Sequence, residues 1–262
     1  MAGFEGNTIV VIGGESGIGR ATVEYLAREG AQVWIGGILE DEARRTLDAT
    51  KSFRGEVKYR KTDVRDSALV GALIDDAQNA SGRLDGLVNC AAIFDGFASC
   101  LDTSDALWDQ IVDVNLRGTF FACRAALKHM VPAKHGKIVN VASIGGLVGM
   151  ADGASYTASK HGVVGLSKHL GCYYAKDGIG INCVCPGAIE TNIRGNSARI
   201  LGSDAPPMGG VGASTDWIKS AIPQQRKGKV SEVTEMIVFL LSDKATYMNG
   251  QCFTVDGGWT AK

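Results

Sequence analysis

The chain has 262 residues, enough for one large domain with a sizeable core, and its 45% hydrophobic fraction excludes a disordered chain. Its 27 Lys and Arg nearly balance 28 Asp and Glu, so the net charge of -1 argues against a nucleic-acid groove or a basic membrane patch. Glycine is in excess, because 35 residues are nearly twice the usual share of about 7%.

Short apolar runs alternate with longer amphipathic stretches along the chain. The expected strands are Thr8–Ile12, Gln32–Ile35, Val57–Lys61, Leu84–Asn89, Lys137–Ala142, Ile181–Cys185 and Cys252–Val255. The expected helices cover 18–29, 40–51, 67–80, 105–131, 154–176 and 231–241. Short strands separated by helices predict βαβ crossovers, and therefore an α/β fold with a buried parallel sheet.

The stretch 187–226 interrupts this alternation, because it has no strong period and is rich in Pro and Gly between positions 206 and 212. A loop of this length in a compact domain is usually a lid, a binding loop or disordered. Nothing in the composition marks a domain boundary. We therefore predict a single domain over residues 1–262, with a flap near its C-terminal third.

The seven cysteines are odd in number and form no CxxC pair, so we expect buried thiols in a reducing compartment and no metal site. The apolar run Ile9–Ile12 is far too short to cross a membrane, and no basic segment precedes it. We therefore expect a cytoplasmic protein with neither a membrane nor a nucleic-acid partner.

A glycine-rich turn follows the first strand, with the sequence Gly13-Gly14-Glu15-Ser16-Gly17-Ile18-Gly19, and a helix comes next. Glycines at 13, 17 and 19 allow a tight turn and let backbone amides approach a pyrophosphate. The helix N-terminus adds the positive end of its dipole. The order strand, turn, helix predicts a dinucleotide site.

The second strand runs into Gly36-Gly37-Ile38, where the choice between NAD and NADP is usually made. A carboxylate there would hold the ribose diol of NAD, and an Arg would hold the 2′-phosphate of NADP. Neither stands at the strand tip, but the absence of a positive charge at Ser16, Gly37 and Ile38 favours NAD. Asp63, followed by Val64, could hydrogen-bond adenine or cap the next helix, and both interpretations stay open.

Four polar residues later in the chain are candidates for the chemical step. Asn115 stands on an otherwise apolar helix face, where its amide needs partners. Ser143 ends the fifth strand, and Tyr156 and Lys160 begin the following helix. Tyr and Lys four residues apart share a helix face, so the ammonium can favour the phenolate and lower the phenol pKa. Tyr156 is therefore a candidate acid and base at neutral pH.

The chain resembles the single-domain short-chain dehydrogenases/reductases over essentially its whole length. The residues that carry the resemblance are Gly13-x-x-x-Gly17-x-Gly19, Asp63, Asn89-Cys90-Ala91-Ala92, Asn115, Ser143, Tyr156-x-x-x-Lys160, Pro186-Gly187 with Thr191, and Asp256-Gly257-Gly258. Two departures, Ile12 where the family usually has Thr and Cys90-Ala91-Ala92 where it usually has Asn-Ala-Gly, could loosen the hydrogen bonds around the cofactor turn.

The resemblance implies a Rossmann-type sheet of about seven parallel strands and hydride transfer with NAD(P). It implies that Tyr156 moves the hydroxyl proton, Ser143 stabilises the substrate oxygen, Lys160 binds the nicotinamide ribose, and Asn115 relays protons through its backbone and a water. The expected cofactor contacts are Gly13, Ser16, Gly17, Ile18, Gly19, Gly37, Ile38, Asp63, Val64, Asn89, Ala91, Tyr156, Lys160, Pro186, Gly187, Ile189 and Thr191.

The expected substrate pocket is mostly apolar, which suggests an uncharged, fairly hydrophobic secondary alcohol or ketone. Its candidate residues are Phe94, Phe97, Ser143, Ile144, Met150, Tyr156, Ala188, Ile193, Met208 and Trp217. Arg194 could instead meet an anionic substrate, although a surface Arg on a flap is usually solvated. Small residues on the two long helices permit close packing within or between subunits, and the resemblance favours a homotetramer.

Other functions remain open. The resemblance also allows an NADPH-dependent ketoreductase acting on acyl thioesters or polar ketones. An enoyl reductase of this fold usually has a longer Tyr–Lys spacing, and a nucleotide-sugar epimerase or dehydratase usually has a larger substrate domain. A non-catalytic protein that senses dinucleotides would not need the acid/base set.

Overall fold

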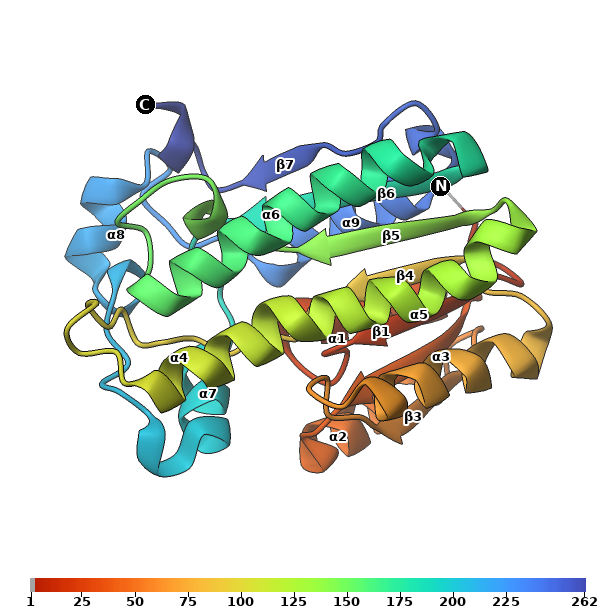
Figure 1. The fold of residues 1–262 in the computed structure, drawn as a ribbon, viewed down its shortest axis with the longest axis horizontal. Coiled ribbons are helices and arrows are strands. Elements are labelled where there is room, and N and C mark those ends of the chain that lie inside the picture. Colours follow the sequence, from red (N-terminus) through yellow and green to blue (C-terminus); the bar gives the residue numbers. More distant parts are fainter. Residues whose placement is uncertain (1–2) are drawn as a thin grey trace.

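The computed structural model describes residues 3–262, and its centre is one sheet of seven parallel strands. The strands are β1 (Thr8–Ile12), β2 (Gln32–Gly37), β3 (Val57–Lys61), β4 (Gly86–Asn89), β5 (Gly136–Val141), β6 (Ile179–Pro186) and β7 (Cys252–Val255). Their order across the sheet is β3-β2-β1-β4-β5-β6-β7 (Figure 1). This arrangement confirms the predicted Rossmann-type fold.

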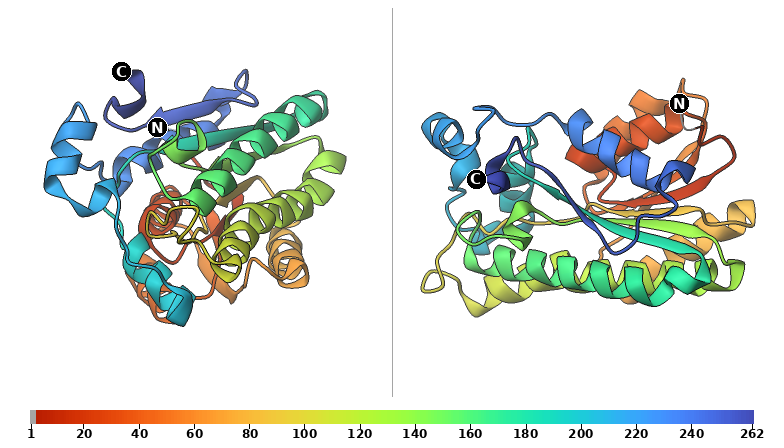
Figure 2. Two further views of the ribbon diagram at one scale, coloured as in Figure 1. Left: turned by 60° about the vertical axis from the view of Figure 1, so that its left-hand side comes forward. Right: turned by 90° about the horizontal axis from the view of Figure 1, so that it is seen from above.

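Helices cover both faces of the sheet. One layer contains α1 (Gly17–Arg28), α2 (Glu40–Thr50) and α9 (Val230–Leu241), and the other contains α3 (Ser67–Ser81), α4 (Asp105–Val112), α5 (Gly118–Ala133) and α6 (Ala154–Tyr174). The right-hand view of Figure 2 shows the sheet between these two layers. No described helix is both long enough and apolar enough to serve as a membrane span.

The alternation of side chains along β1 explains why this strand is apolar from Ile9 to Ile12. Ile9 and Val11 pack in the core beneath α1 and α9, whereas Val10 and Ile12 pack in the core beneath the other helices. Both faces of a parallel sheet are buried, so no position of the strand can be polar without a partner. Each such side chain contributes roughly 1.5–3 kcal/mol by leaving water.

The strand order reverses direction between β1 and β4, which places a crevice at their carboxyl ends. The chain turns at Gly13 after β1 and at Cys90 after β4. Two backbone hydrogen bonds join these turns to the sheet: the Gly13 amide donates to the Gly36 carbonyl at 2.7 Å, and the Cys90 amide donates to the Ile12 carbonyl at 2.8 Å. The residues that depart from the family pattern therefore keep main-chain bonds that need no particular side chain.

Two segments differ from the prediction. The single helix expected over 105–131 is divided by a π-helical turn, η1 (Asp113–Arg117). The flap expected to lack regular structure contains α7 (Ile193–Leu201) and α8 (Thr215–Ala221), which lie beyond the carboxyl ends of the strands (Figure 1). The remaining short turns are η2 (Ile144–Gly146), η3 (Ala175–Asp177), η4 (Gly202–Asp204), η5 (Val211–Ala213), η6 (Asp243–Ala245) and η7 (Trp259–Ala261).

Candidate active site

The glycine-rich turn, Gly13–Gly19, forms an open cradle that would be blocked if its glycines carried side chains. Gly13 has a φ of +75°, and a Cβ there would lie 2.5 Å from the Ala91 nitrogen. A Cβ on Gly19 would overlap the Gly13 carbonyl, where the first turn of α1 packs against the loop. Only glycine allows this approach, and the space left free adjoins the N-terminus of α1, which favours an anion.

A cavity extends from this cradle toward the end of β2 and holds most of the expected cofactor residues. It is lined by Gly13, Ser16, Gly17, Ile18, Gly19, Gly37, Ile38, Asp63, Val64, Ala91 and Thr191. The Asp63 carboxylate on its wall is paired with the Arg65 guanidinium at 2.6 Å. Pro186, Gly187 and Ile189 line a second, neighbouring cavity.

Asn89 is a correction to the expected cofactor contacts. Its side chain is buried inside the sheet and does not line either cavity. The amide donates to Asn140 Oδ1 at 2.8 Å and lies 3.5 Å from Cys123 Sγ. It therefore joins β4 to β5 and α5, because a buried amide must find its partners within the protein.

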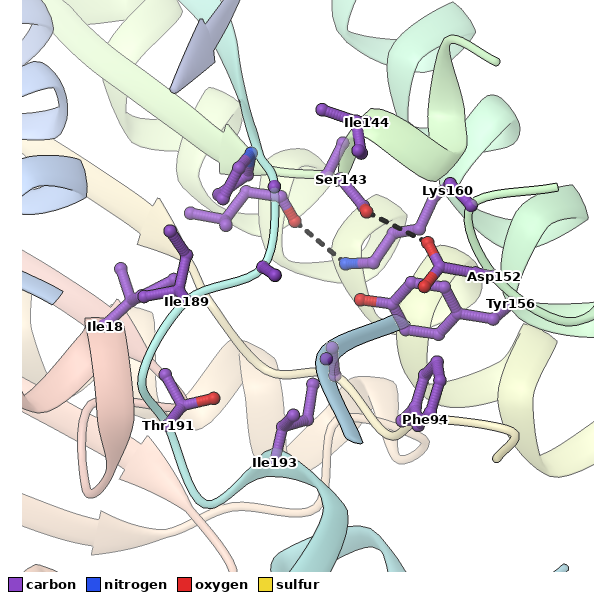
Figure 3. Close-up of a pocket in the computed structure, with 18 of the residues that line it drawn as sticks. Ile18, Phe94, Ser143, Ile144, Asp152, Tyr156, Lys160, Ile189, Thr191 and Ile193 are labelled. Atoms are coloured by element: carbon purple, nitrogen blue, oxygen red, sulfur yellow. Dashed lines mark hydrogen bonds between the residues drawn. The ribbon is translucent and has the colours of Figure 1, made fainter. Parts of the chain in front are cut away.

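The second cavity brings together three of the predicted catalytic residues. Ser143 follows β5, and Tyr156 and Lys160 lie on the first turns of α6 (Figure 3). The start of α6 is fixed by Asp95, whose carboxylate accepts hydrogen bonds from the Tyr156 amide at 2.8 Å and the Ser155 hydroxyl at 3.0 Å. This buried carboxylate therefore fixes the start of α6.

Tyr156 is buried against the edge of Phe94, with the ring centroids 5.3 Å apart. Burial, reinforced by the nearby carboxylates of Asp152 and Asp95, raises the pKa of the Tyr156 phenol well above its usual value. The sequence predicts the opposite direction, because it considers only the ammonium of Lys160. The two acidic residues that oppose a phenolate are close in space but are not obvious from spacing along the chain.

Lys160 is hydrogen-bonded to the backbone at the end of β5. Its Nζ donates to the Val141 carbonyl at 2.9 Å and lies 5.4 Å from the centroid of the Tyr156 ring (Figure 3). Burial lowers the pKa of the Lys160 ammonium to about 8. The ammonium therefore lies at the cavity wall between β5 and the Tyr156 ring.

Ser143 is oriented by hydrogen bonds on both sides. Its hydroxyl accepts from the Gly145 amide at 3.0 Å and donates to Asp152 Oδ2 at 3.1 Å (Figure 3). Burial raises the pKa of the Asp152 carboxyl to about 6, although the bond from Ser143 opposes this shift. A Cβ on Gly145 would overlap Asp152, so glycine makes the room for this pair.

Asn115 lies in the π-turn η1 rather than in a regular α-helix. Its amide side chain bonds to both the amide and the carbonyl of Ile93, at 2.9 and 3.0 Å, and donates to Ser159 Oγ at 3.1 Å. Its own backbone carbonyl accepts a hydrogen bond from Thr119 Oγ1 at 2.8 Å. The side chain thus ties the loop after β4 to α6, which satisfies a fully buried amide.

The expected substrate residues divide into two groups. Phe94, Ile144, Ala188 and Ile193 line the same cavity as Ser143, Tyr156 and Lys160. Met150, Met208 and Trp217 do not line it. Met150 is 82% exposed, Trp217 is half exposed and packs on Phe97 with the ring centroids 5.9 Å apart, and Met208 packs against the core. Phe97 does not line the cavity either, and these four predictions are corrected, because the side chains lie outside the cavity lining.

Two charged side chains make the cavity more polar than the sequence predicts. Asp152 lies next to Ser143, and Arg194 of α7 is stacked over Phe94, with its guanidinium carbon 5.2 Å from the ring centroid. Its Nε donates to the Gly209 carbonyl at 3.2 Å. Sequence reasoning missed Asp152, although a carboxylate shortly before the catalytic tyrosine could have drawn attention to it.

Three thiols form the group among the described residues that could hold a metal ion. The Sγ atoms of Cys183, Cys185 and Cys252 all lie within 4.8 Å of one another on neighbouring strands. They pack beside α6 with apolar residues. These cysteines are scattered along the chain, but the register of β6 and β7 brings them together in the fold.

Comparisons with known proteins agree with this architecture. Residues 12–260 match the family model described as enoyl-(acyl carrier protein) reductase. The chain is 36% identical to 2-(S)-hydroxypropyl-CoM dehydrogenase 3 of Xanthobacter autotrophicus, over 98% of each protein. It is 33% identical to 3beta-hydroxysteroid dehydrogenase 2 of Eggerthella lenta, over 98% of this chain and 95% of that one. The crystal structure of levodione reductase matches with a TM-score of 0.86 at 34% identity, over 98% of this chain and 99% of the other.

Proposed function

The chain belongs to the short-chain dehydrogenase/reductase family, and from this premise we propose that it interconverts a secondary alcohol and a ketone with a nicotinamide dinucleotide. The observation that carries the proposal is the cavity shared by Ser143, Tyr156 and Lys160, which adjoins the glycine cradle. The named relatives act as dehydrogenases or reductases, in agreement with this reaction class.

The residues around the cradle fit a dinucleotide. Gly13, Gly17 and Gly19 would hold the pyrophosphate against the backbone, and Pro186, Gly187, Ile189 and Thr191 would surround the nicotinamide. When bound, this cofactor accepts or delivers the hydride. The protein supplies position, exclusion of water and control of protons. We propose NAD(H) as the preferred form, because no unpaired cation lines the cavity at the end of β2.

Tyr156 is proposed to accept the hydroxyl proton of an alcohol, or to give its phenol proton to a ketone oxygen. Its high pKa keeps the phenol protonated in the empty site, which suits proton donation to a ketone. Ser143 would donate a hydrogen bond to the same substrate oxygen. It can do so only by turning its proton away from Asp152, to which it now donates.

Lys160 and Asn115 have supporting roles in this proposal. The Lys160 ammonium would bind ribose hydroxyls of the nucleotide and stabilise negative charge on the phenol oxygen. Asn115 would act in proton relay through its backbone and a water, while its side chain holds the loop after β4 in place. The lowered pKa of Lys160 makes exchange of its proton easier near neutral pH than for an exposed lysine.

The substrate is proposed to be uncharged and fairly hydrophobic around its reacting carbon. Phe94, Ile144, Ala188 and Ile193 supply the apolar wall. Asp152 and Arg194 add one carboxylate and one guanidinium, so a hydroxyl or carbonyl group elsewhere on the substrate would find a partner. A ketone with such a second polar group, including an acyl thioester, is the alternative that Arg194 favours.

Other reaction classes have less support in the site. An enoyl reductase is the description of the matching family model, but Tyr156 and Lys160 are four residues apart and Ser143 stands beside them. A protein that only senses dinucleotides would not require an acid, a base and an oriented hydroxyl in one cavity. A cavity of this composition is instead suited to proton transfer at a carbinol oxygen.

Purified protein should oxidise secondary alcohols or reduce ketones when a panel of both is offered with NAD(H) and with NADP(H). The reaction is followed by the absorbance of the reduced nicotinamide. Activity with cyclic or aromatic ketones that exceeds activity with simple carboxylates would support the apolar wall. Turnover restricted to carbon–carbon double bonds conjugated to a thioester would contradict the proposed reaction.

We also propose that the protein assembles as a homotetramer in the cytoplasm. Phe120 of α5, Trp108 of α4 and Tyr173 of α6 leave large aromatic surface exposed on the outer helical layer. Burial of such surface between subunits is favourable. We expect a mass in solution close to four chains by light scattering, whereas a stable monomer at micromolar concentration would contradict this assembly.

A further inference from the structure

Gly37 ends β2, and the carboxylate of Glu15 fills the space that a side chain at position 37 would need. A Cβ on Gly37 would overlap both carboxylate oxygens of Glu15, which comes from the glycine-rich turn after β1. The two residues are 22 positions apart but stand together on the wall of the dinucleotide cavity. The strand tip that lacks a selecting side chain is therefore next to a carboxylate that reaches it from the neighbouring loop.

Glu15 is held in an environment that lacks a donor for one of its oxygens. The side chain is 5% exposed, and its Oε2 is buried without any hydrogen-bond partner. Burial raises the pKa of the Glu15 carboxyl, while the backbone amides of Leu39 and Ile38 oppose this shift. A buried carboxylate oxygen without a donor is unfavourable, so this position is suited to a ligand that brings hydroxyl groups.

The surroundings of Glu15 are unsuited to a second phosphate. Arg65 lines the same cavity, but its guanidinium is already engaged with Asp63 by two nitrogens. Lys61 ends β3, and its Nζ forms an ion pair with Glu40 Oε1 at 2.7 Å. A phosphate near Glu15 would therefore meet a carboxylate and find the nearest cations paired.

From this arrangement we infer that Glu15 is the residue that selects NAD(H), by accepting the two hydroxyls of the adenosine ribose and excluding a 2′-phosphate. The carboxylate that the strand tip lacks is supplied by the phosphate loop, and Gly37 is needed to accommodate it. This inference rests on the proposed function, because it assumes that a nicotinamide dinucleotide occupies the cavity.

A structural role for Glu15 makes a different prediction. If the carboxylate only caps the amides of Ile38 and Leu39 at the start of α2, its replacement would change stability and leave the choice of cofactor untouched. The selecting role requires the ratio of the two affinities to change. Binding must therefore be measured separately from turnover and from thermal stability.

The test is isothermal titration of the full protein with NAD+ and with NADP+. The wild type should bind NAD+ at least about tenfold more tightly than NADP+. Glu15→Gln should weaken NAD+ binding about tenfold and leave NADP+ binding equal or stronger, so that the preference falls. Glu235→Gln removes an exposed carboxylate on α9, outside the dinucleotide cavity, and should leave both affinities unchanged, which makes it the matched control.

Two further variants test whether the carboxylate can act from the strand tip instead of the phosphate loop. Gly37→Asp alone should lose NAD+ affinity, because the new side chain would overlap Glu15. Glu15→Gly combined with Gly37→Asp should recover the preference for NAD+, since it returns one carboxylate to the strand tip. Thermal unfolding of each variant identifies any loss of folded protein.

The outcomes separate the two levels of inference. An unchanged NAD+ to NADP+ ratio in Glu15→Gln, or equal affinities in the wild type, would overturn the role of Glu15 and leave the enzyme assignment intact. Failure of the wild type to bind either dinucleotide would overturn the proposed function itself. A lowered ratio that the double variant restores supports the assignment.

Discussion

Tyr156→Phe is expected to lower turnover by roughly 10³-fold in both directions, within the range for loss of a general acid and base. The phenol is the buried group placed to exchange a proton with the substrate oxygen, whereas its ring contributes packing against Phe94 that phenylalanine preserves. Dinucleotide affinity should change little. Steady-state kinetics combined with calorimetric titration of the cofactor measure the two quantities separately.

Tyr174→Phe is the matched control, because Tyr174 lies on the same helix, far from the cavity, and is only partly buried. It should retain nearly normal turnover. Near-normal activity in Tyr156→Phe would instead show that another group moves the proton, and the proposed mechanism would be wrong. A parallel loss in both variants would point to damage to α6 rather than to chemistry.

Asp152→Asn is expected to stabilise the protein above pH 6 and to have little effect near pH 4. The folded pKa of about 6 exceeds the usual 3.8, so folding takes up a proton between these values. The stability contributed by the neutral carboxyl is fully present below pH 3.8 and is lost as pH rises to 6. Above that pH the ionised group costs up to about 3 kcal/mol. Thermal unfolding at several pH values measures the difference.

The same substitution should move the pH dependence of alcohol oxidation toward lower pH. The charge of Asp152 helps to raise the Tyr156 pKa, and the neutral amide of Asn removes that contribution. Asp109→Asn, an exposed change in the middle of α4, is the control and should shift neither the stability nor the rate profile. A rate profile that is identical in Asp152→Asn and the wild type would show that Asp152 is not coupled to the proton transfer.

The strands could be predicted from the sequence because they are short, alternate with helix-length segments, and in the centre of the sheet are buried on both faces. Thr8–Ile12, Val57–Lys61 and Cys252–Val255 are confirmed to the residue, and the other four strands shift only at their ends. An apolar run bounded by glycine or by a charged helix start leaves few alternatives. The family resemblance implied about seven parallel strands, whereas their order across the sheet comes from the structure.

The parts that escaped prediction depend on contacts between distant segments. The direction of the Tyr156 pKa shift depends on Asp95 and Asp152, which approach the phenol only after the loop from β4 and the turn after Ser143 fold together. The sequence gives no sign of a special role for Glu15 within the phosphate turn. The Glu15 carboxylate comes close to Gly37 only in the folded protein. The flap helices lack the long apolar period that identifies a helix in sequence.

The π-turn at Asp113–Arg117 constrains the chain in one further way. Within it the Gly118 amide bonds to the Asp113 carbonyl, five residues back, so α4 and α5 are joined through one wide turn. Deleting a residue here would rotate every inward-facing side chain of α5 by about 100° relative to α4. It would also remove Asn115 from its bonds to Ile93. The number of residues in this helical segment therefore sets the rotation of α5 against α4, just as the amide of Asn115 sets the position of the loop after β4.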